Sequence, residues 1–234
     1  MTHFILASSS PRRVELLHML LDDFEVATSN VEETGSGLQP ENPPTPLSLP
    51  SDFAVSPADH PTLWAWRKAL DVAQREHGDG DRLILGADTI VIAPGAVLGK
   101  PATSERARAM LAALRGRDHF VATGYALLHT DGSTITTLFS GAVVSTVLMR
   151  DYSDTKLEGY VATGEPMDKA GAYAVQGLGS ALVSRVEGCY YNVVGLPVCE
   201  IQDLLVKRGA LPAHAARHFC DFCPLRNRTA GASL

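Results

Sequence analysis

The sequence predicts an α/β protein in which a mixed, elongated sheet is flanked by helices and two lobes enclose a substrate cleft. Strand-length apolar runs alternate along the chain with segments of helical period. Two extended segments near the middle are separated by Asp131-Gly132, which is a hairpin signal and indicates a mixed rather than a purely parallel sheet. A chain of 234 residues with 45% hydrophobic content can bury a large core without a disulfide or a metal.

The amino-terminal part begins with a strand, a turn and a helix in succession. Residues 4–7 form an apolar strand, and Ser8-Ser9-Ser10 turns the chain. Pro11 then takes the first position of a helix that extends to about residue 21, with Ser10 as its N-cap. A second strand is predicted over residues 24–28.

Residues 35–62 differ in composition from the rest of the chain. Seven prolines fall there among glycine, serine and aspartate, and no helical or strand period persists. This composition indicates a long surface loop. Two interpretations remain open: a mobile insertion without a catalytic role, or a lid over an active site.

Beyond this loop, helices and extended segments alternate. The first expected elements are a helix over residues 61–77 and strands over 83–87 and 90–93, interrupted at Gly86-Ala87-Asp88-Thr89. A helix from Thr103 or Ser104 to Gly116 and extended segments over 120–129 and 135–148 come next. The last are a helix from Asp151 or Ser153 to about 162, a strand over 181–186, and a helix that follows Gly195-Leu196-Pro197 and ends at Gly209.

Charge and hydropathy argue against several classes of partner. The net charge is −6 and the sequence pI is close to 5.7, so the chain lacks the general basic field of a nucleic-acid-binding protein. Apolar runs reach only about eight residues, far short of the ~20 that a transmembrane helix needs. The first arginines follow the first apolar run, opposite to a secretory signal. We therefore expect a cytoplasmic protein without membrane or nucleic-acid partners.

The first motif with chemical meaning is Ser8-Ser9-Ser10-Pro11-Arg12-Arg13. A serine-rich turn before a helix presents backbone N–H groups, while the positive end of the helix dipole disfavours each arginine by roughly 0.3–1 kcal/mol. A phosphate bound in front of the helix would resolve this conflict. The alternative is that both arginines are solvated, or paired with Glu15 or another carboxylate.

Two further motifs place single charged residues beside small ones. Asp88, in Gly86-Ala87-Asp88-Thr89, is suited to ligate a divalent cation or to orient water, although an ordinary turn aspartate has the same appearance. Lys100, in Gly99-Lys100-Pro101, is not part of a phosphate loop, because Pro101 replaces the hydroxyl residue that would hold magnesium. Lys100 can still reach a phosphate as a point charge.

The densest polar segment runs from Glu165 to Gly177 and reads EPMDKAGAYAVQG. Its small residues permit close approach of the backbone to a ligand. The Gln176 amide offers both donors and an acceptor, as reading a base edge requires, although an ordinary polar loop is the alternative. The following Gly177-Leu178-Gly179 is not a dinucleotide motif, because Leu182 occupies the position of its third glycine.

Taken together, these motifs resemble the Maf-like nucleotide pyrophosphatases. A strand followed by SxSPRR, then Glu32-Glu33, GADT, GKP, EPxDKAGAYxxQG and NVVGLP occur in the order and approximate spacing of that family, over about residues 4–208 apart from the Pro-rich loop. The resemblance implies a Maf- and ITPase-like α/β fold with a cleft between two lobes. It also implies hydrolysis of a nucleoside triphosphate between its α and β phosphates, with magnesium or manganese as the divalent metal.

The resemblance further implies roles for individual residues. Asp88 corresponds to the proton acceptor, and Glu33 to a cleft acid that helps to hold the metal with Asp88. The implied phosphate-binding residues are Ser8, Ser10, Arg13, Lys68, Lys100 and Lys169. The implied specificity residues are Arg12, Thr89 and Gln176.

The motifs also resemble one substrate branch of the family. GADT and DKAGAYAVQG are similar to enzymes for dTTP and UTP, with modified pyrimidine nucleotides as further candidates. An amide such as Gln176 can match the carbonyl–imide edge of a pyrimidine, and leaving such buried groups unpaired is costly. The alternatives are a 7-methyl-GTP pyrophosphatase, which would carry a GSDQ-like segment, and a nucleotide-binding regulator of septum formation with little turnover. A housecleaning role linked to cell-division arrest is compatible with the dTTP and UTP pyrophosphatase.

The ends of the chain suggest two parts. Residues 1–209 form the Maf-like domain with its Pro-rich insertion, and residues 210–234 form a tail. The tail contains His214, His218, Cys220 and Cys223, whose residue types are those of a zinc site. Because His218 and Cys220 are so close, a structural zinc and a loosely packed tail both remain interpretations. A homodimer is compatible with the resemblance.

Overall fold

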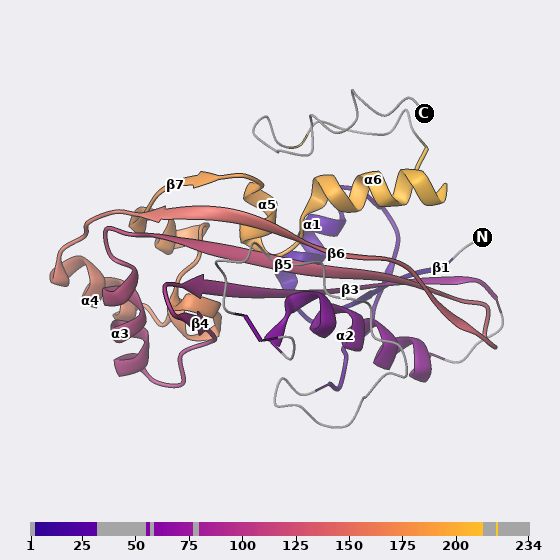
Figure 1. Cartoon of the computed structure of the whole chain (residues 1–234), viewed down its shortest axis with the longest axis horizontal. Helices are drawn as coiled ribbons and strands as arrows, with labels where there is room; N and C mark the ends of the chain where they lie inside the picture. Colours follow the sequence, from indigo (N-terminus) through magenta and orange to yellow (C-terminus); the bar gives the residue numbers. More distant parts are fainter. Residues whose placement is uncertain (1–2, 32–54, 57–58, 77–79, 213–218, 220–234) are drawn as a thin grey trace.

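The computed structural model describes residues 3–31, 55–56, 59–76, 80–212 and 219 (Figure 1). The predicted Pro-rich loop over residues 35–62 lies largely outside the described residues. So do Glu33 and the four candidate zinc ligands His214, His218, Cys220 and Cys223.

One mixed sheet runs through the molecule, as the sequence predicts. The described strands are β1 His3–Ala7, β2 Glu25–Val26, β3 Arg82–Ala93, β4 Ala96–Leu98, β5 Asp118–Thr130, β6 Ile135–Met149 and β7 Val183–Glu187. Their order is β2-β1-β3-β5-β6-β7, and β4 pairs with β3 off this path. β1 is parallel to β2 and β3, whereas all other pairings are antiparallel.

Helices cover both faces of this sheet (Figure 1). Helix α2 (Pro61–Arg75) lies along one face, and α1 (Pro11–Leu17), α5 (Tyr190–Val194) and α6 (Val198–Arg208) lie on the other. Helices α3 (Ser104–Leu114) and α4 (Asp154–Ala162) pack at the far end. Three short 3-10 helices follow α4: η2 Glu165–Asp168, η3 Ala170–Ala172 and η4 Gly177–Leu182. No helix in the described part of the chain is long and apolar enough to cross a membrane.

The hydrophobic core is divided by the sheet. Side chains of successive strand residues point to opposite faces, so Leu83 and Leu85 of β3 join the larger cluster with α1, α3 and α6, while Ile84 joins the cluster under α2. Each of these three side chains is at most 2% exposed. Burial of one such leucine or isoleucine contributes about 1.5–3 kcal/mol, which fixes β3 as the central strand.

Helix α2 lies unusually close to the sheet, and this closeness depends on two glycines. A Cβ atom at Gly86 would lie 2.0 Å from the Ala65 carbonyl oxygen, and one at Gly124 would lie 2.2 Å from the Pro61 carbonyl carbon. Both positions must therefore lack a side chain. The result is that α2 places Lys68 directly over the middle of β3.

Several predicted helix ends are confirmed. Thr103 Oγ1 accepts a hydrogen bond from Arg106 N at 3.2 Å and caps α3. Ser153 Oγ caps α4 by accepting from Lys156 N at 3.2 Å. Gly209 ends α6 in a left-handed conformation with φ of 76°, as a glycine after a helix commonly does.

The predicted interruption of the strand at Gly86-Ala87-Asp88-Thr89 is wrong. β3 is continuous through these residues and pairs with β5 at every one of them. The small residues do not mark a turn; Gly86 accommodates α2 on one face of a regular strand, and Ala87 is buried on the other face. Asp88 is therefore held by the sheet and not by a loop.

Other predicted boundaries differ by a few residues. Helix α1 ends at Leu17 rather than residue 21, and β2 covers only Glu25–Val26. Ser10 is the N-cap residue, but its side chain makes no capping hydrogen bond; instead Ser8 Oγ accepts from Ser10 N at 3.3 Å. β7 begins at Val183 because the preceding residues form η4. Strand β4 and helix α5 were not predicted.

Candidate active site

A cavity opens where β1 ends. β1 pairs with β3 as far as Gly86, and β4 pairs with β3 only from Val91 onward. Between these two partners, in the described part of the chain, the edge of β3 at Asp88 is not covered by a strand. A cavity of about 400 Å³ lies at this edge, within the size range of small-molecule sites.

The cavity brings together most of the residues that the sequence nominated. The nominated residues that line it are Ser8, Ser10, Arg12, Arg13, Lys68, Asp88, Thr89, Lys100, Lys169 and Gln176. They come from the turn after β1, from α1, α2 and β3, and from the segments that follow β4 and α4. Five of the ten are lysines or arginines, so the cavity is suited to a highly charged anion.

Asp88 and Lys68 form the most buried ion pair of the cavity. Lys68 Nζ lies 2.6 Å from Asp88 Oδ1, and the two side chains are 14% and 13% exposed. The Lys68 side chain extends from α2 toward the sheet, and the Asp88 side chain extends from β3 toward α2. This contact through Oδ1 holds the Asp88 carboxylate in one orientation.

Arg13 connects three walls of the cavity. Its guanidinium donates from Nε to Gly195 O at 2.9 Å, from Nη1 to Ser8 Oγ at 3.3 Å and from Nη2 to Thr89 Oγ1 at 3.1 Å. These partners belong to the segment after α5, the turn after β1, and β3. The conflict between Arg13 and the helix dipole is therefore met by hydrogen bonds within the protein, which neither of the sequence alternatives anticipated.

Thr89 continues this polar network through the sheet. Its Oγ1 lies 2.9 Å from Thr123 Oγ1, and Thr123 donates in turn to the Asn192 carbonyl oxygen at 2.8 Å. Asn192 is fully buried, and its amide donates to Val121 O and Ser145 Oγ. Buried polar groups need such partners, and here they hold α5 against β5 and β6 behind the cavity.

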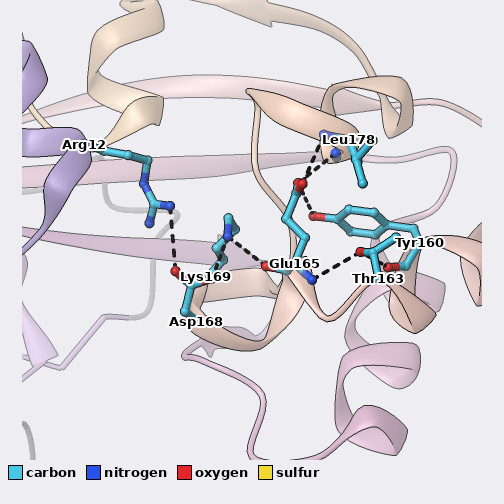
Figure 2. A network of polar contacts seen from close by, with 8 residues as sticks. Arg12, Tyr160, Thr163, Glu165, Asp168, Lys169 and Leu178 are labelled. Atoms are coloured by element: carbon cyan, nitrogen blue, oxygen red, sulfur yellow. Dashed lines mark hydrogen bonds and ion pairs between the residues drawn. The ribbon is translucent and has the colours of Figure 1, made fainter.

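Arg12 and Lys169 line the cavity and lie on either side of Asp168 (Figure 2). Arg12 Nη1 is 3.8 Å from Asp168 Oδ2, and Lys169 Nζ is 2.5 Å from Asp168 Oδ1. Burial raises the pKa of the Asp168 carboxyl, but the hydrogen bond and charge of Lys169 and the charge of Arg12 outweigh it and leave that pKa below its ordinary value. For Arg12, the alternative of a carboxylate partner is thus realised, with Asp168 in place of Glu15.

Apolar side chains also line the cavity. They include Val91, Val121, Tyr173, Val175 and Val194. Behind Tyr173 lies His119, which is fully buried; its Nε2 is 2.7 Å from Tyr173 Oη, and the two rings meet edge-on at 5.3 Å. A cavity lined by both apolar and charged side chains matches a ligand that joins a flat base to a polyphosphate.

Among the described residues, Asp88 can hold a divalent metal together with a ligand. No group of three His, Cys, Asp or Glu side chains within the described residues could hold a metal alone. Magnesium, however, commonly binds through one or two carboxylates together with substrate phosphates. Asp88 and a bound polyphosphate fit that donor set.

Four contributing residues received no role from the sequence. Glu165 and Tyr173 were part of a recognised motif without an assigned function, and Asn192 was part of NVVGLP. Asn192 carried a usable signal, because an amide within the apolar run Tyr190–Val194 must find buried hydrogen-bond partners. His119 gave no such signal, since its partner Tyr173 is 54 residues away.

Comparisons with known proteins show which proteins this chain resembles. The family model described as Maf-like protein matches residues 3–208. A dTTP/UTP pyrophosphatase of Dictyoglomus thermophilum is 42% identical over 88% of this chain and 95% of its own length. Proteins of the same name from Geobacter sulfurreducens and Thermococcus onnurineus are 42% and 43% identical, over 88% and 83% of this chain and 97% and 91% of theirs.

Proposed function

Because this chain belongs to the Maf-like protein family, we propose that it is a nucleoside triphosphate pyrophosphatase that converts dTTP and UTP to the monophosphate and pyrophosphate. The relatives named dTTP/UTP pyrophosphatase support the activity, since this chain covers almost their whole length. The observation that carries the proposal is the Lys68–Asp88 pair, which lies in a cavity lined by further cations.

The proposed reaction is a direct attack by water on the α-phosphorus. Asp88 takes a proton from the water as its oxygen forms a bond to phosphorus, while the bond to the bridging oxygen breaks and pyrophosphate leaves. Lys68 orients Asp88 through the 2.6 Å contact. This route needs no covalent intermediate, so Ser8 and Ser10 serve as phosphate contacts and not as nucleophiles.

The cations of the cavity stabilise the negative charge that builds up on the phosphates. Lys68, Lys100, Lys169 and Arg13 all line the cavity, where fixed charges in a water-poor site act strongly on a transition state. Lys169 must exchange part of its contact with Asp168 for the phosphate. The Arg13 charge stabilises the phosphates while its guanidinium keeps its hydrogen bonds to Ser8, Thr89 and Gly195.

A divalent metal completes the proposed site. Magnesium or manganese, when bound, neutralises phosphate charge and polarises the P–O bonds. Asp88 and the substrate phosphates would hold it, with Glu33 as a second acid by resemblance to the family.

Base recognition is proposed to rest on Arg12, Thr89 and Gln176. All three line the cavity, and the Gln176 amide can pair with the carbonyl and imide N–H of thymine or uracil. A site built around such pairs rejects bases that leave its polar groups unpaired. Modified pyrimidine nucleotides with the same edge are further substrates under this proposal.

The test is pyrophosphate release from a panel of nucleotides. The wild type, Asp88→Asn and the surface control Asp154→Asn would be incubated with magnesium or manganese and dTTP, UTP, CTP, GTP, ATP or 7-methyl-GTP. We expect turnover of dTTP and UTP, a loss of roughly 10²–10⁴-fold in Asp88→Asn, and no loss in the control. Oxygen-18 from solvent should appear in the monophosphate.

Each alternative has its own result. Preference for 7-methyl-GTP would keep the chemistry and contradict the base assignment to Thr89 and Gln176. Tight nucleotide binding without turnover would contradict the enzyme and favour a regulator of septum formation. Oxygen-18 in pyrophosphate would contradict attack at the α-phosphorus.

Further features of the proposal lie outside the cavity. We propose a cytoplasmic, homodimeric enzyme with a housecleaning role, made of one Maf-like domain over residues 1–209 with a Pro-rich insertion and a tail. A zinc ion bound by His214, His218, Cys220 and Cys223 stays a prediction. Metal analysis of the purified chain, before and after truncation at Gly209, measures it directly.

A further inference from the structure

Glu165 is not among the residues that line the cavity, and it lies at the centre of a network of polar contacts (Figure 2). Its carboxylate accepts three hydrogen bonds: Oε2 from Leu178 N at 3.1 Å, and Oε1 from Gly179 N at 2.9 Å and from Tyr160 Oη at 3.1 Å. Two of the three donors are backbone groups of the segment that follows Gln176. The carboxylate therefore holds the start of η4.

The Gly177-Leu178-Gly179 segment has a conformation that requires glycine. Gly177 has φ of 66°, and a Cβ there would lie 3.0 Å from Glu165 Oε2. A Cβ on Gly179 would lie 2.6 Å from Tyr160 Oη. The two glycines, which do not form a dinucleotide motif, thus let successive backbone N–H groups approach a carboxylate of the same chain.

Gln176 immediately precedes this segment. It is the N-cap residue of η4 with an extended backbone, and its side chain makes no capping hydrogen bond. Gln176 lines the cavity. Because its own side chain does not anchor the turn, the place of its amide in the cavity depends on the path of residues 177–179.

Glu165 is itself held from two other directions. Its backbone N–H donates to Thr163 Oγ1 at 3.1 Å, next to the end of α4, and its carbonyl oxygen accepts from Lys169 Nζ at 2.7 Å. One residue therefore connects the rigid end of α4 with both a cation of the cavity and the Gln176 turn. Figure 2 shows these contacts converging on Glu165.

We propose that Glu165 is a positioning residue for base recognition, which fixes residues 177–179 from behind so that the Gln176 amide faces the nucleotide base. The inference rests on the proposed function, because it names what determines specificity at that same site. Glu165 does not touch the substrate; it acts through Gln176.

The ionisation of Glu165 agrees with this role. Burial raises the pKa of its carboxyl, but the hydrogen bonds from Gly179, Leu178 and Tyr160 and the charge of Lys169 outweigh burial, and the pKa lies below its ordinary value. At neutral pH the group is a carboxylate, which can accept all three hydrogen bonds at once.

The test compares UTP with CTP in a Glu165→Gln variant. Uracil presents a carbonyl and an imide N–H where cytosine presents an amino group and a ring nitrogen. Glutamine has the size of glutamate but only one acceptor oxygen and no charge. We expect the ratio of kcat/KM for UTP to that for CTP to fall by roughly tenfold, as loss of one hydrogen bond would give, mainly through a higher KM for UTP.

The matched control is Glu158→Gln on α4. It makes the same chemical change at an exposed ion pair with Arg108, and the UTP-to-CTP ratio should equal that of the wild type. A melting curve of each variant shows that it is folded.

A double-mutant cycle shows whether Glu165 acts through Gln176. In a Gln176→Ala background the further change Glu165→Gln should leave the UTP-to-CTP ratio unaltered. An undiminished effect in that background, or an unaltered ratio in the folded single variant, would overturn the proposal.

If Glu165→Gln does not fold, Tyr160→Phe replaces it. That variant removes the 3.1 Å hydrogen bond to Oε1, together with the hydrogen bond between the same hydroxyl and the Ala174 backbone, and it should lower the UTP-to-CTP ratio in the same direction but less. No change in Tyr160→Phe would then overturn the proposal. A wild type that hydrolyses neither UTP nor dTTP would instead contradict the proposed function, and with it this inference.

Discussion

His119 is a titratable side chain enclosed by the sheet and the cavity wall. Burial lowers the pKa of its imidazole to about 4, and the charge of Asp118 opposes this shift only in part. The side chain is therefore neutral in the folded protein at neutral pH, where Nε2 meets the hydroxyl of Tyr173 at 2.7 Å. Since Tyr173 lines the cavity, the protonation of His119 affects the cavity as well as the fold.

This burial predicts how stability changes with pH. Between pH 6.5 and 4 the unfolded chain binds a proton at His119 that the folded chain does not, so the free energy of unfolding falls as the pH falls through this window. The full effect is about 3 kcal/mol, from 1.36 kcal/mol per unit of pKa difference. Chemical denaturation at several pH values measures it.

The comparison for this prediction is His119→Gln. We expect it to be less stable than the wild type at pH 7, because it loses packing, but to show a flatter decline between pH 6.5 and 4. Between pH 7 and 8 the two proteins should change in parallel. Equal slopes below pH 6.5 would show that His119 titrates as freely in the folded state as in the unfolded state.

Among single residues, motifs in the sequence identified those that line the cavity. They did not identify residues that hold the cavity-lining residues in place. Arg12, Arg13, Asp88 and Gln176 stand in recognisable segments, and the cavity contains all of them. The hydrogen bonds of Arg13 could not be foreseen, because Gly195 is 182 positions away along the chain. A single sequence does not encode such separations in any local pattern.

At the scale of elements, the contact between α2 and the sheet decides the geometry of the Lys68–Asp88 pair. Gly86 and Gly124 lie on neighbouring strands, and each is overlaid by backbone of α2 at distances that exclude a Cβ atom. Moving α2 outward by even a methyl group would draw Lys68 away from Asp88. Packing and chemistry therefore depend on the same two positions.

A glycine substitution tests this dependence. Gly124→Ala forces a Cβ against the Pro61 backbone, 2.2 Å away, where neither partner can rotate aside. We expect a loss of at least about 3 kcal/mol, at the upper end for overpacked cores, and a fall in kcat for dTTP in whatever fraction remains folded. Thermal melting and pyrophosphate release measure the two effects.

The matched control is Gly159→Ala in α4. A Cβ there meets nothing within 4 Å, so the change should stabilise the helix by up to about 1 kcal/mol. Activity should stay that of the wild type. Similar melting temperatures for the two alanine variants would contradict the close approach of α2.

The same contact explains why one element was mispredicted. Gly86 and Ala87 have the appearance of a break, because small residues are typical of turns, and the sequence alone offered two short strands. The structure has one continuous strand, since the register with β5 is unbroken from Arg82 to Ile92. Hairpins and helix caps were predictable from local signals, whereas a glycine required by a distant helix was not.

At the scale of the whole molecule, the cavity results from unequal strand lengths. β1 has 5 residues and β3 has 12, so the sheet lacks a neighbour for β3 where β1 stops. The family resemblance predicted a cleft in a mixed sheet, and the fold confirms the mixed sheet with its flanking helices. How the cleft arises depends on strand pairing, which tertiary contacts determine.

Removal of the divalent metal should abolish the activity of the whole molecule but leave its thermal stability unchanged. The described cores consist of apolar side chains, so a chelator should abolish pyrophosphate release without lowering the melting temperature. Added magnesium should restore the activity. A large fall in melting temperature on chelation would contradict this expectation and would favour a structural metal such as the predicted zinc in the tail.

The bond from Arg13 to Gly195, which spans 182 positions, has a consequence for biosynthesis. Arg13 is translated well before Gly195, so a growing chain on the ribosome has no complete site until Gly195 has been added. The β5–β6 hairpin, whose contacts are local, can form early, whereas contacts between distant segments form slowly. Prematurely terminated chains that still bind metal or phosphate through the early segments would therefore lack catalysis. Pyrophosphatase activity is expected only from molecules in which the segment with Gly195 has been made and folded.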